Sequence, residues 1–174
     1  KDKLCLIQLC SENSKEVHIV QFVNRGNYKS PNLVKLLINP DIKKVFHYAR
    51  KDTEMIRWAL GIHVNNVECT KIQSRLARGY SSQHSYKTLV QEFCGISISK
   101  AKQASDFGKK NLDSKQLEYS ANDVLHILKI HEELNKILVR EKRMELYKES
   151  LKFLKVRVEL DIAGYEKTDI WNHE

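Results

Sequence analysis

Proline and glycine are scarce in this chain, with two and six residues among 174. This composition excludes a linker-like or collagen-like polymer, which needs far more of both. No apolar run approaches the ~20 residues of a membrane-spanning helix, so we expect no membrane partner. Hydrophobic residues still make up 41% of the chain, which is enough to bury a core in one domain and excludes a wholly disordered protein.

Cysteine is also sparse, and its four positions form no CxxC pair. Cys5 and Cys10 lie five residues apart in a strand-like run, so their side chains point to opposite faces and cannot share a metal ion there. The seven histidines form no ligand-spaced cluster. These absences argue against a zinc site or disulfides and favour free thiols in a reducing, cytoplasmic location.

Acidic residues are thinnest between Lys71 and Lys115. The chain has 30 Lys and Arg against 22 Asp and Glu, but this stretch holds nine basic and three acidic residues, and its first seventeen residues include no acid. Basic side chains mixed with aromatic ones such as Tyr86 suit a nucleic-acid backbone with stacked bases. The candidate substrate-binding residues of this stretch are Arg78 and His84. An ordinary solvated face explains the charge alone equally well.

The hydrophobic pattern predicts an α/β fold. Two adjacent antiparallel strands are expected at Lys3–Cys10 and Glu16–Val23, followed by a helix that Ser30 caps. Strands and helices then alternate, at Lys43–Tyr48 (strand), Asp52–Leu60 (helix), Ile62–Cys69 (strand) and Lys71–Arg78 (helix). This order indicates a mixed sheet flanked by helices rather than a sandwich or a bundle.

The second half of the chain is expected to be helical. Its longest helix begins near Asp113, which can cap the helix while Gln116 closes a capping box, and it runs past Glu133. The other expected segments are a helix at Ser85–Phe93, a basic helix or loop at Ser99–Lys110, a break or bend near Arg140–Lys148 and an extended tail at Phe153–Glu174.

Tyr119 and Asp123 stand four residues apart, which places them on one face of that long helix. Apolar residues follow Asp123 around most of the helix circumference, so we expect this segment to be buried; they are Val124, Leu125, Ile127, Leu128 and Ile130. A buried carboxylate must be paired, hydrogen-bonded or bound to a metal ion. Without further information, a Tyr–Asp hydrogen bond inside a core is the stronger interpretation.

Asp52 lies where a buried strand passes into a helix. Carboxylates at such strand ends are suitable ligands for hard cations such as Mg²⁺ or Mn²⁺. Aspartate is also a favoured helix cap, so a purely structural role is a strong alternative. Glu54 does not chelate with Asp52, because side chains two residues apart on a helix diverge by about 200°.

Five segments occur in order: KLCLIQLC, VFHYARKD, HSYKTLV, ISKAKQASDF and LDSKQLEYSANDVLHIL. Together they resemble the ribonuclease D group of DnaQ-like 3′→5′ exonucleases, in the tyrosine-containing DEDD subclass. The ECTKI segment and the ending FLKVRVELDIAGYEKTDIWNH bring the resemblance closest to the small nano-RNase C type, which trims very short RNAs. The resemblance covers essentially the whole chain and implies a ribonuclease H-like fold.

What the resemblance implies is a phosphodiesterase that uses two Mg²⁺ or Mn²⁺ ions. Asp52 and Asp123 match two of the family's four metal-binding carboxylates, and Tyr119 matches the tyrosine that orients the attacking water. His47 matches the family's histidine near the scissile phosphate. The segment expected on the nucleic-acid side, or bracing the site, contributes Lys100, Gln103, Ser105 and Asp106. Phe107 replaces the family's usual tryptophan, with an expected effect on packing only.

One half of the family's metal site does not occur in this sequence. The family carries an Asp-x-Glu pair on its first strand, whereas this chain opens where the second strand begins, and Asp2 has no partner two residues on. We expect the pair roughly ten to fifteen residues before Lys3, on the central strand of the sheet. Residues 1–174 are therefore expected to be a single exonuclease domain that is incomplete at its N-terminus.

Three functions are compatible with these features. The first is a 3′→5′ exoribonuclease that degrades short oligonucleotides as a homo-oligomer; the resemblance implies the octameric ring of the closest family. The second is a tRNA-processing ribonuclease D, although no helical accessory domain for structured RNA follows in this sequence. The third is a truncated nucleic-acid-binding protein that keeps the basic groove without the chemistry.

Overall fold

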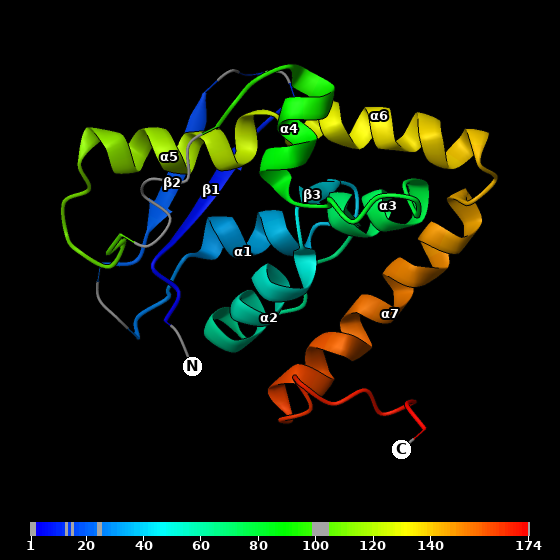
Figure 1. Cartoon of the computed structure of the whole chain (residues 1–174). Coiled ribbons are helices and arrows are strands. Elements are labelled where there is room, and N and C mark those ends of the chain that lie inside the picture. Colours follow the sequence, from blue (N-terminus) through cyan, green and yellow to red (C-terminus); the bar gives the residue numbers. More distant parts are fainter. Residues whose placement is uncertain (1–2, 13, 15, 24–25, 99–104, 174) are drawn as a thin grey trace.

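The computed structural model describes residues 3–12, 14, 16–23, 26–98 and 105–173. It begins with an antiparallel hairpin of β1 (Leu6–Cys10) and β2 (Val17–Gln21), in which Leu6 lies opposite Gln21 and Cys10 opposite Val17. Helix α5 (Ser114–Leu125) packs on this hairpin (Figure 1). The expected pairing of the first two strands is confirmed.

A parallel β-α-β unit forms the second layer. Strands β3 (Lys44–Phe46) and β4 (Val67–Cys69) pair in parallel and are joined through α2 (Ala49–Leu60). Within the described residues the strands form two separate two-stranded sheets, β1-β2 and β3-β4. Among these residues β1 pairs only with β2 and β3 only with β4, so one edge of β1 and one edge of β3 have no strand partner. The α/β class is confirmed, and the mixed sheet is present as two halves.

Two helix starts differ from expectation. Helix α2 begins at Ala49 rather than Asp52, so Asp52 lies inside the first turns and does not cap the helix. The capping position belongs to Tyr48, whose φ of 67° is left-handed. Helix α1 (Pro31–Ile38) begins after Ser30 as expected, but the Ser30 hydroxyl donates to the Tyr28 carbonyl instead of capping the helix.

The helices of the second half are shorter and more numerous than expected. Helix α3 (Thr70–Ala77) precedes α4 (Tyr86–Cys94), and the expected long helix is divided into α5, α6 (Ile127–Arg140) and α7 (Met144–Ile162). The capping box of Asp113 and Gln116 at the start of α5 is confirmed. None of the helices in the described ranges is long and apolar enough to cross a membrane.

The expected extended tail from Phe153 is wrong, because α7 continues to Ile162. Leu154, Val158 and Asp161 recur at helical spacing and are all buried, so the protein covers one face of this helix. Arg157 also pairs with Asp161 one turn later, at 2.7 Å. Tertiary burial and this pair favour helix over the strand that the local β-branched residues suggest.

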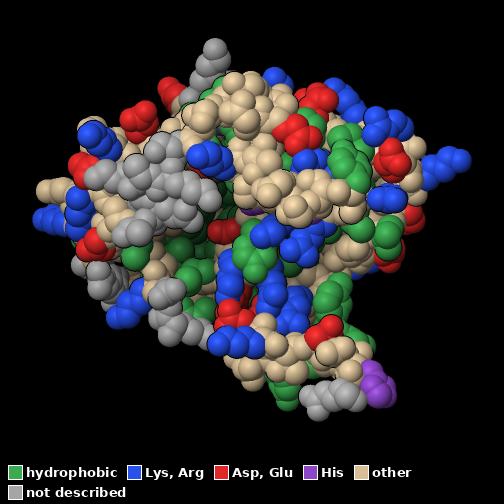
Figure 2. Space-filling model, viewed as in Figure 1, with side chains coloured by type: hydrophobic (Ala, Val, Ile, Leu, Met, Phe, Trp, Pro, Cys, Tyr) green, Lys and Arg blue, Asp and Glu red, His purple; other side chains and the backbone are tan. Residues whose placement is uncertain are grey.

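Seen as a space-filling surface, the view of Figure 1 has a hollow near its middle. Acidic side chains lie at the floor of this hollow, and Lys and Arg side chains gather beside it (Figure 2). The basic side chains lie over the region where Figure 1 places α2 and the start of α3. This arrangement of charge is suited to a metal-dependent site that takes an anionic chain.

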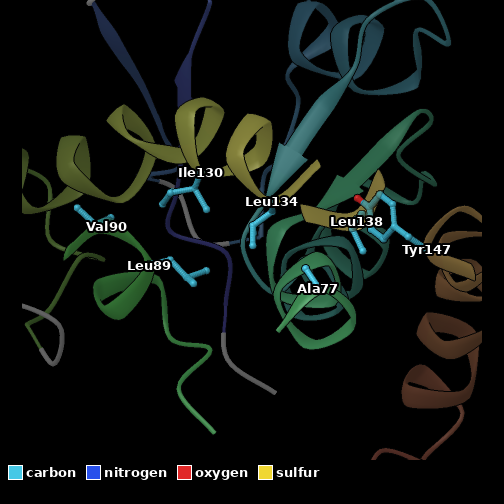
Figure 3. Packing of buried hydrophobic residues seen from close by; sticks show 7 residues of the cluster. All are labelled: Ala77, Leu89, Val90, Ile130, Leu134, Leu138 and Tyr147. Atoms are coloured by element: carbon cyan, nitrogen blue, oxygen red, sulfur yellow. The ribbon is translucent and has the colours of Figure 1, made fainter. Parts of the chain in front are cut away.

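The main core lies between α3, α4, α6 and α7 (Figure 3). Its buried members are Ala77, Leu89, Val90, Ile130, Leu134, Leu138 and Tyr147. A second cluster joins the hairpin to α1 and α2 through Leu4, Phe22, Leu33, Leu37 and Ile56. The second cluster includes Ile56 of α2, the helix that carries Asp52, whereas α5, which carries Tyr119 and Asp123, packs on β1 and β2.

A buried polar network links α3 to α6 inside the main core. His131 lies with Nδ1 at 3.0 Å from Gln73 Oε1 and Nε2 at 3.1 Å from Asn135 Nδ2, while Gln73 Nε2 donates to Asn135 Oδ1 at 2.8 Å. Burial is the main reason why the pKa of His131 is lowered from 6.5. The neutral imidazole therefore satisfies both neighbours, with one nitrogen donating and the other accepting.

This network predicts a pH-dependent stability. The unfolded chain takes up a proton on His131 near pH 6.5, whereas the folded chain does so only at lower pH. The contribution of neutral His131 to the free energy of unfolding is therefore fully present above pH 6.5 and is lost as the pH falls. His131→Leu is expected to lower the free energy of unfolding at pH 7.5 by about 1–3 kcal/mol, because Gln73 and Asn135 lose their partner. Urea unfolding at pH 7.5 and 5.5 measures both effects. An equally steep loss of stability with acid in the variant would contradict this role.

Candidate active site

Two carboxylates from different layers of the fold lie near each other, since the charge of Asp123 acts on Asp52. Asp52 lies in the first turns of α2, and Asp123 lies near the end of α5. The Asp52 side chain is open to solvent, yet the surrounding protein desolvates it enough to raise its pKa to about 7, and the charge of Asp123 adds to the shift. Burial raises the pKa of half-buried Asp123 to about 6. The pair therefore behaves as two acids in a protein-walled cleft.

Tyr119 lies one turn before Asp123 on the same helix, as the spacing predicts. Burial and the charge of Asp123 raise the pKa of the Tyr119 phenol, so it stays protonated at neutral pH. Its ring lies 6.0 Å from that of Phe107, centre to centre, which is consistent with a packing role for Phe107.

The alternative of a Tyr–Asp hydrogen bond inside a core is not supported. Among the described residues, the Tyr119 phenol makes no hydrogen bond with Asp123. The segment after Asp123 is also less buried than expected: Ile127 and Ile130 are buried, but Leu125 is 39% exposed. Asp123 thus borders a cleft and is not enclosed in a core.

His47 follows β3 and lies beside this cleft as a neutral imidazole. Burial and the charge of Lys71 lower its pKa to about 4. Its Nδ1 lies 2.9 Å from the Thr70 hydroxyl, and it makes a backbone hydrogen bond with His84. These contacts fix the ring at the boundary between β3 and α3.

Tyr86 is a site residue that sequence reasoning did not select. Its hydroxyl donates to the carbonyl of Asn122 at 3.2 Å and accepts from the His126 amide at 3.3 Å, and its ring lies 5.6 Å from the His47 ring. Burial and the charge of Asp123 raise its pKa. Tyr86 therefore ties α4 to the junction of α5 and α6, next to Asp123, and no local pattern signals this.

Arg78 and His84 were candidates for substrate binding, and the structure gives both a structural contact. Arg78 is 4% exposed and donates to Ser74 Oγ, the Gln83 carbonyl and Glu92. His84 Nδ1 lies 2.9 Å from the same Ser74 hydroxyl. A contact of either residue with substrate stays a prediction.

The segment before α5 is described from Ser105 onward, so Lys100 and Gln103 lie outside the described residues. Gln116 Nε2 donates to Ser105 Oγ at 3.1 Å and to the Asp106 carbonyl at 3.0 Å. Since Gln116 also completes the capping box of α5, Ser105 braces the helix that carries Tyr119 and Asp123.

The chemistry of Asp52 and Asp123 fits a divalent cation. Neither makes an ion pair with Lys or Arg in the part of the chain that the structure describes, and the raised pKa of each carboxyl indicates that a nearby positive charge would be favourable. Carboxylates suit Mg²⁺, which is usually held by one or two of them together with water and substrate phosphates. No group of three or more His, Cys, Asp or Glu among the described residues could hold a metal ion.

Comparison of the sequence with known proteins identifies a family and several relatives. A family model described as 3′-5′ exonuclease matches residues 1–139. Ribonuclease D of Gluconacetobacter diazotrophicus is 34% identical over 82% of the chain, and that of Acidiphilium cryptum 32% over 97%. The chain spans 35% and 41% of the length of these two relatives.

Solved structures extend the likeness to the whole described fold. Brucella melitensis NrnC bound to pGG superimposes with a TM-score of 0.92 at 38% identity, covering 99% of this chain and 82% of that one. The same protein with bound Mg²⁺ gives 0.91 at 37%, covering 99% and 83%. Escherichia coli RNase D shares the fold, with a TM-score of 0.78 at 20% identity over 91% of this chain and 42% of its own.

The match of the 3′-5′ exonuclease model over residues 1–139, within this α/β fold, shows that the chain is a 3′-5′ exonuclease domain and belongs to that family. Within the family it is of the ribonuclease D and NrnC type, as the resemblance of its motifs implies. The ribonuclease H-like fold class is confirmed by the same neighbours.

Proposed function

We propose that this domain hydrolyses short oligoribonucleotides from the 3′ end and releases nucleoside monophosphates. The observation that carries the proposal is the convergence of Asp52 from α2 and Asp123 from α5 on one cleft, with Tyr119 one turn away. The match to NrnC over nearly the whole chain supports the choice of short substrates, because that protein is known bound to pGG.

In this proposal Asp52 and Asp123 would hold divalent ions, Mg²⁺ or Mn²⁺. Such ions, when bound, activate water and stabilise the attacking and leaving oxygens of the displacement. Tyr119 keeps its proton at neutral pH, so its hydroxyl can donate a hydrogen bond that orients the attacking water or a phosphate oxygen. Neutral His47 orients the phosphate by hydrogen bonding and not by charge.

The remaining carboxylates are proposed to come from a further strand placed between β1 and β3. Among the described residues each of these strands is paired along one edge only, with β2 and β4 respectively. An additional strand between them would join the two halves into one mixed sheet and satisfy both open edges. An Asp-x-Glu pair on that strand would complete the four-carboxylate set.

A restricted substrate length is proposed to come from assembly of copies of this chain into a closed ring. Access to the site would then be limited by the channel and not by base contacts. Static light scattering tests this part separately: a mass of several chains supports it, and a monomer at working concentration contradicts it.

The activity is tested with the N-terminally complete protein, Mg²⁺ or Mn²⁺, labelled pGG, a longer RNA and a tRNA precursor. Much faster turnover of pGG supports the proposal. Trimming of the tRNA precursor alone would favour the ribonuclease D alternative. Binding of RNA in EDTA, with no mononucleotide released in either metal, would favour a nucleic-acid-binding protein.

Tyr119→Phe is expected to lower kcat about 100-fold, since a positioned acid–base group contributes on this scale. Stability should not change, because the hydroxyl makes no hydrogen bond with any described residue. Single-turnover cleavage of pGG together with a thermal melt measures both. Tyr80→Phe, at a tyrosine that is 82% exposed, is the matched control. Unchanged kcat in the Tyr119 variant would remove its catalytic role.

A further inference from the structure

Lys71 occupies an unusual position beside the cleft. It is the second residue of α3, and its Nζ lies 4.2 Å from the ring centre of Tyr48, the residue that precedes α2. An ammonium group at this distance from an aromatic face is attracted to the ring. The two residues therefore bridge the starts of α2 and α3, the two helices that leave the ends of β3 and β4.

The positive charge of Lys71 acts on the site itself. It lowers the pKa values of His47 and His84, which places the ammonium group close to both rings. Lys71 has no carboxylate partner within ion-pair distance in the described ranges. The neighbouring cations differ in this respect: Arg50 pairs with Asp161 and Lys51 with Glu166.

The backbone at Tyr48 is strained. Its φ of 67° is in the left-handed region, which is unfavourable for a residue with a Cβ. Tyr48 remains 37% exposed and is not locked in place by core packing. Strained backbone conformations cluster at functional sites, so the strain at Tyr48 suggests that its side chain has a role there.

We propose that Lys71 binds a phosphate of the oligonucleotide substrate and that Tyr48 is the positioning residue that holds its ammonium group over the cleft. This inference rests on the proposed nuclease function and adds a substrate-binding residue to it. Lys71 has no ion-pair partner among the described residues, and its charge acts on His47, the residue proposed to orient the phosphate. An ammonium group in this position would provide positive charge on the protein side of a bound phosphate. Cation–π contact limits the motion of its flexible chain without neutralising it.

The test compares steady-state cleavage of pGG and of GpG by Lys71→Met, Lys71→Arg, Tyr48→Leu and Tyr48→Phe in the N-terminally complete protein. Lys71→Met is expected to raise KM about tenfold, while kcat changes less than about twofold. This pattern is expected because the lost hydrogen bond to a charged group stabilises the bound substrate and the transition state equally. Lys71→Arg should retain most of the affinity. Tyr48→Leu should raise KM less, and Tyr48→Phe should match the wild type.

Salt dependence separates a phosphate contact from a structural effect. The slope of log KM against log salt should fall by roughly 0.7 in Lys71→Met, because one phosphate contact is lost. Lys87→Met, at an exposed lysine of the same basic stretch, is the control and should keep the wild-type slope. A larger effect on pGG than on GpG assigns the contact to the terminal phosphate, and an equal effect assigns it to the internal one.

Two failures are distinguishable. If the wild type cleaves pGG but Lys71→Met keeps the KM and salt slope of Lys87→Met, the role of Lys71 is refuted and the nuclease function stands. If the wild type cleaves no RNA with either metal, both proposals are refuted. Thermal melts of all variants identify any that fail to fold, and Lys71→Arg then decides, since recovery with arginine requires a charge at this position.

Discussion

Asp123→Asn is expected to lower the turnover of short RNA on the order of 1,000-fold in the N-terminally complete protein. The substitution keeps the shape of the side chain but removes the negative charge that a divalent ion requires, and such ions supply several kcal/mol of transition-state stabilisation. Folding should be unaffected or slightly improved without metal, because burial raises the pKa of Asp123 and the charge of Asp123 raises that of Asp52.

The control for this variant is Glu118→Gln on the same helix, at an exposed position. It removes one negative charge from α5 at a distance from the cleft and should leave turnover unchanged. Turnover, measured with saturating Mg²⁺ or Mn²⁺, and a thermal melt distinguish loss of chemistry from loss of fold. An Asp123→Asn enzyme with wild-type turnover would remove Asp123 from the metal site.

Asp161→Asn is expected to have the largest effect on stability, a loss of about 3–5 kcal/mol in the free energy of unfolding. Asp161 is a fully buried carboxylate that accepts from two guanidinium groups: Arg50 at 2.6 and 2.8 Å, and Arg157 at 2.7 and 3.1 Å. These bonds lower its pKa despite burial. Removal of its charge would leave two arginines without compensation, which is the costly way to break a buried pair.

The same arginines hold the C-terminal segment against α2. Arg50 Nη2 donates to the carbonyl of Glu166, and Arg157 Nη2 donates to those of Tyr165 and Glu166. Glu159→Gln is the matched control, since Glu159 lies on the same helix but its pair with Arg57 is largely solvated, and its effect should be much smaller. Chemical denaturation of both variants tests the difference, and an equal loss in the two would contradict the buried network.

Local sequence signals predicted the elements in which short-range chemistry dominates. The capping box of Asp113 and Gln116 and the four-residue spacing of Tyr119 and Asp123 are both properties of one helix, and the structure has them as expected. The motifs also select Asp52 and Asp123 on different helices, and the structure places them near enough for the charge of Asp123 to raise the pKa of Asp52. Here the resemblance to a known family supplied the long-range information that spacing alone lacks.

The features that sequence reasoning missed depend on tertiary contacts. The start of α2 was misplaced because Tyr48 takes a left-handed conformation that no tyrosine pattern indicates. The tail after Phe153 was expected to be extended because it mixes apolar and charged residues, whereas the Arg50–Asp161 pair is formed across 111 residues of chain. Arg78 was selected as a candidate substrate-binding residue of the basic stretch, but it is buried and donates to Ser74, Gln83 and Glu92.

The most direct test of the account is a crystal structure of the N-terminally complete protein soaked in Mn²⁺, with anomalous scattering used to locate the metal. We expect an anomalous peak within bonding distance of carboxylate oxygens of Asp52 and Asp123, with the Tyr119 hydroxyl facing the same space. A well-occupied metal elsewhere, with these two carboxylates turned away from it, would contradict the assignment of the active site.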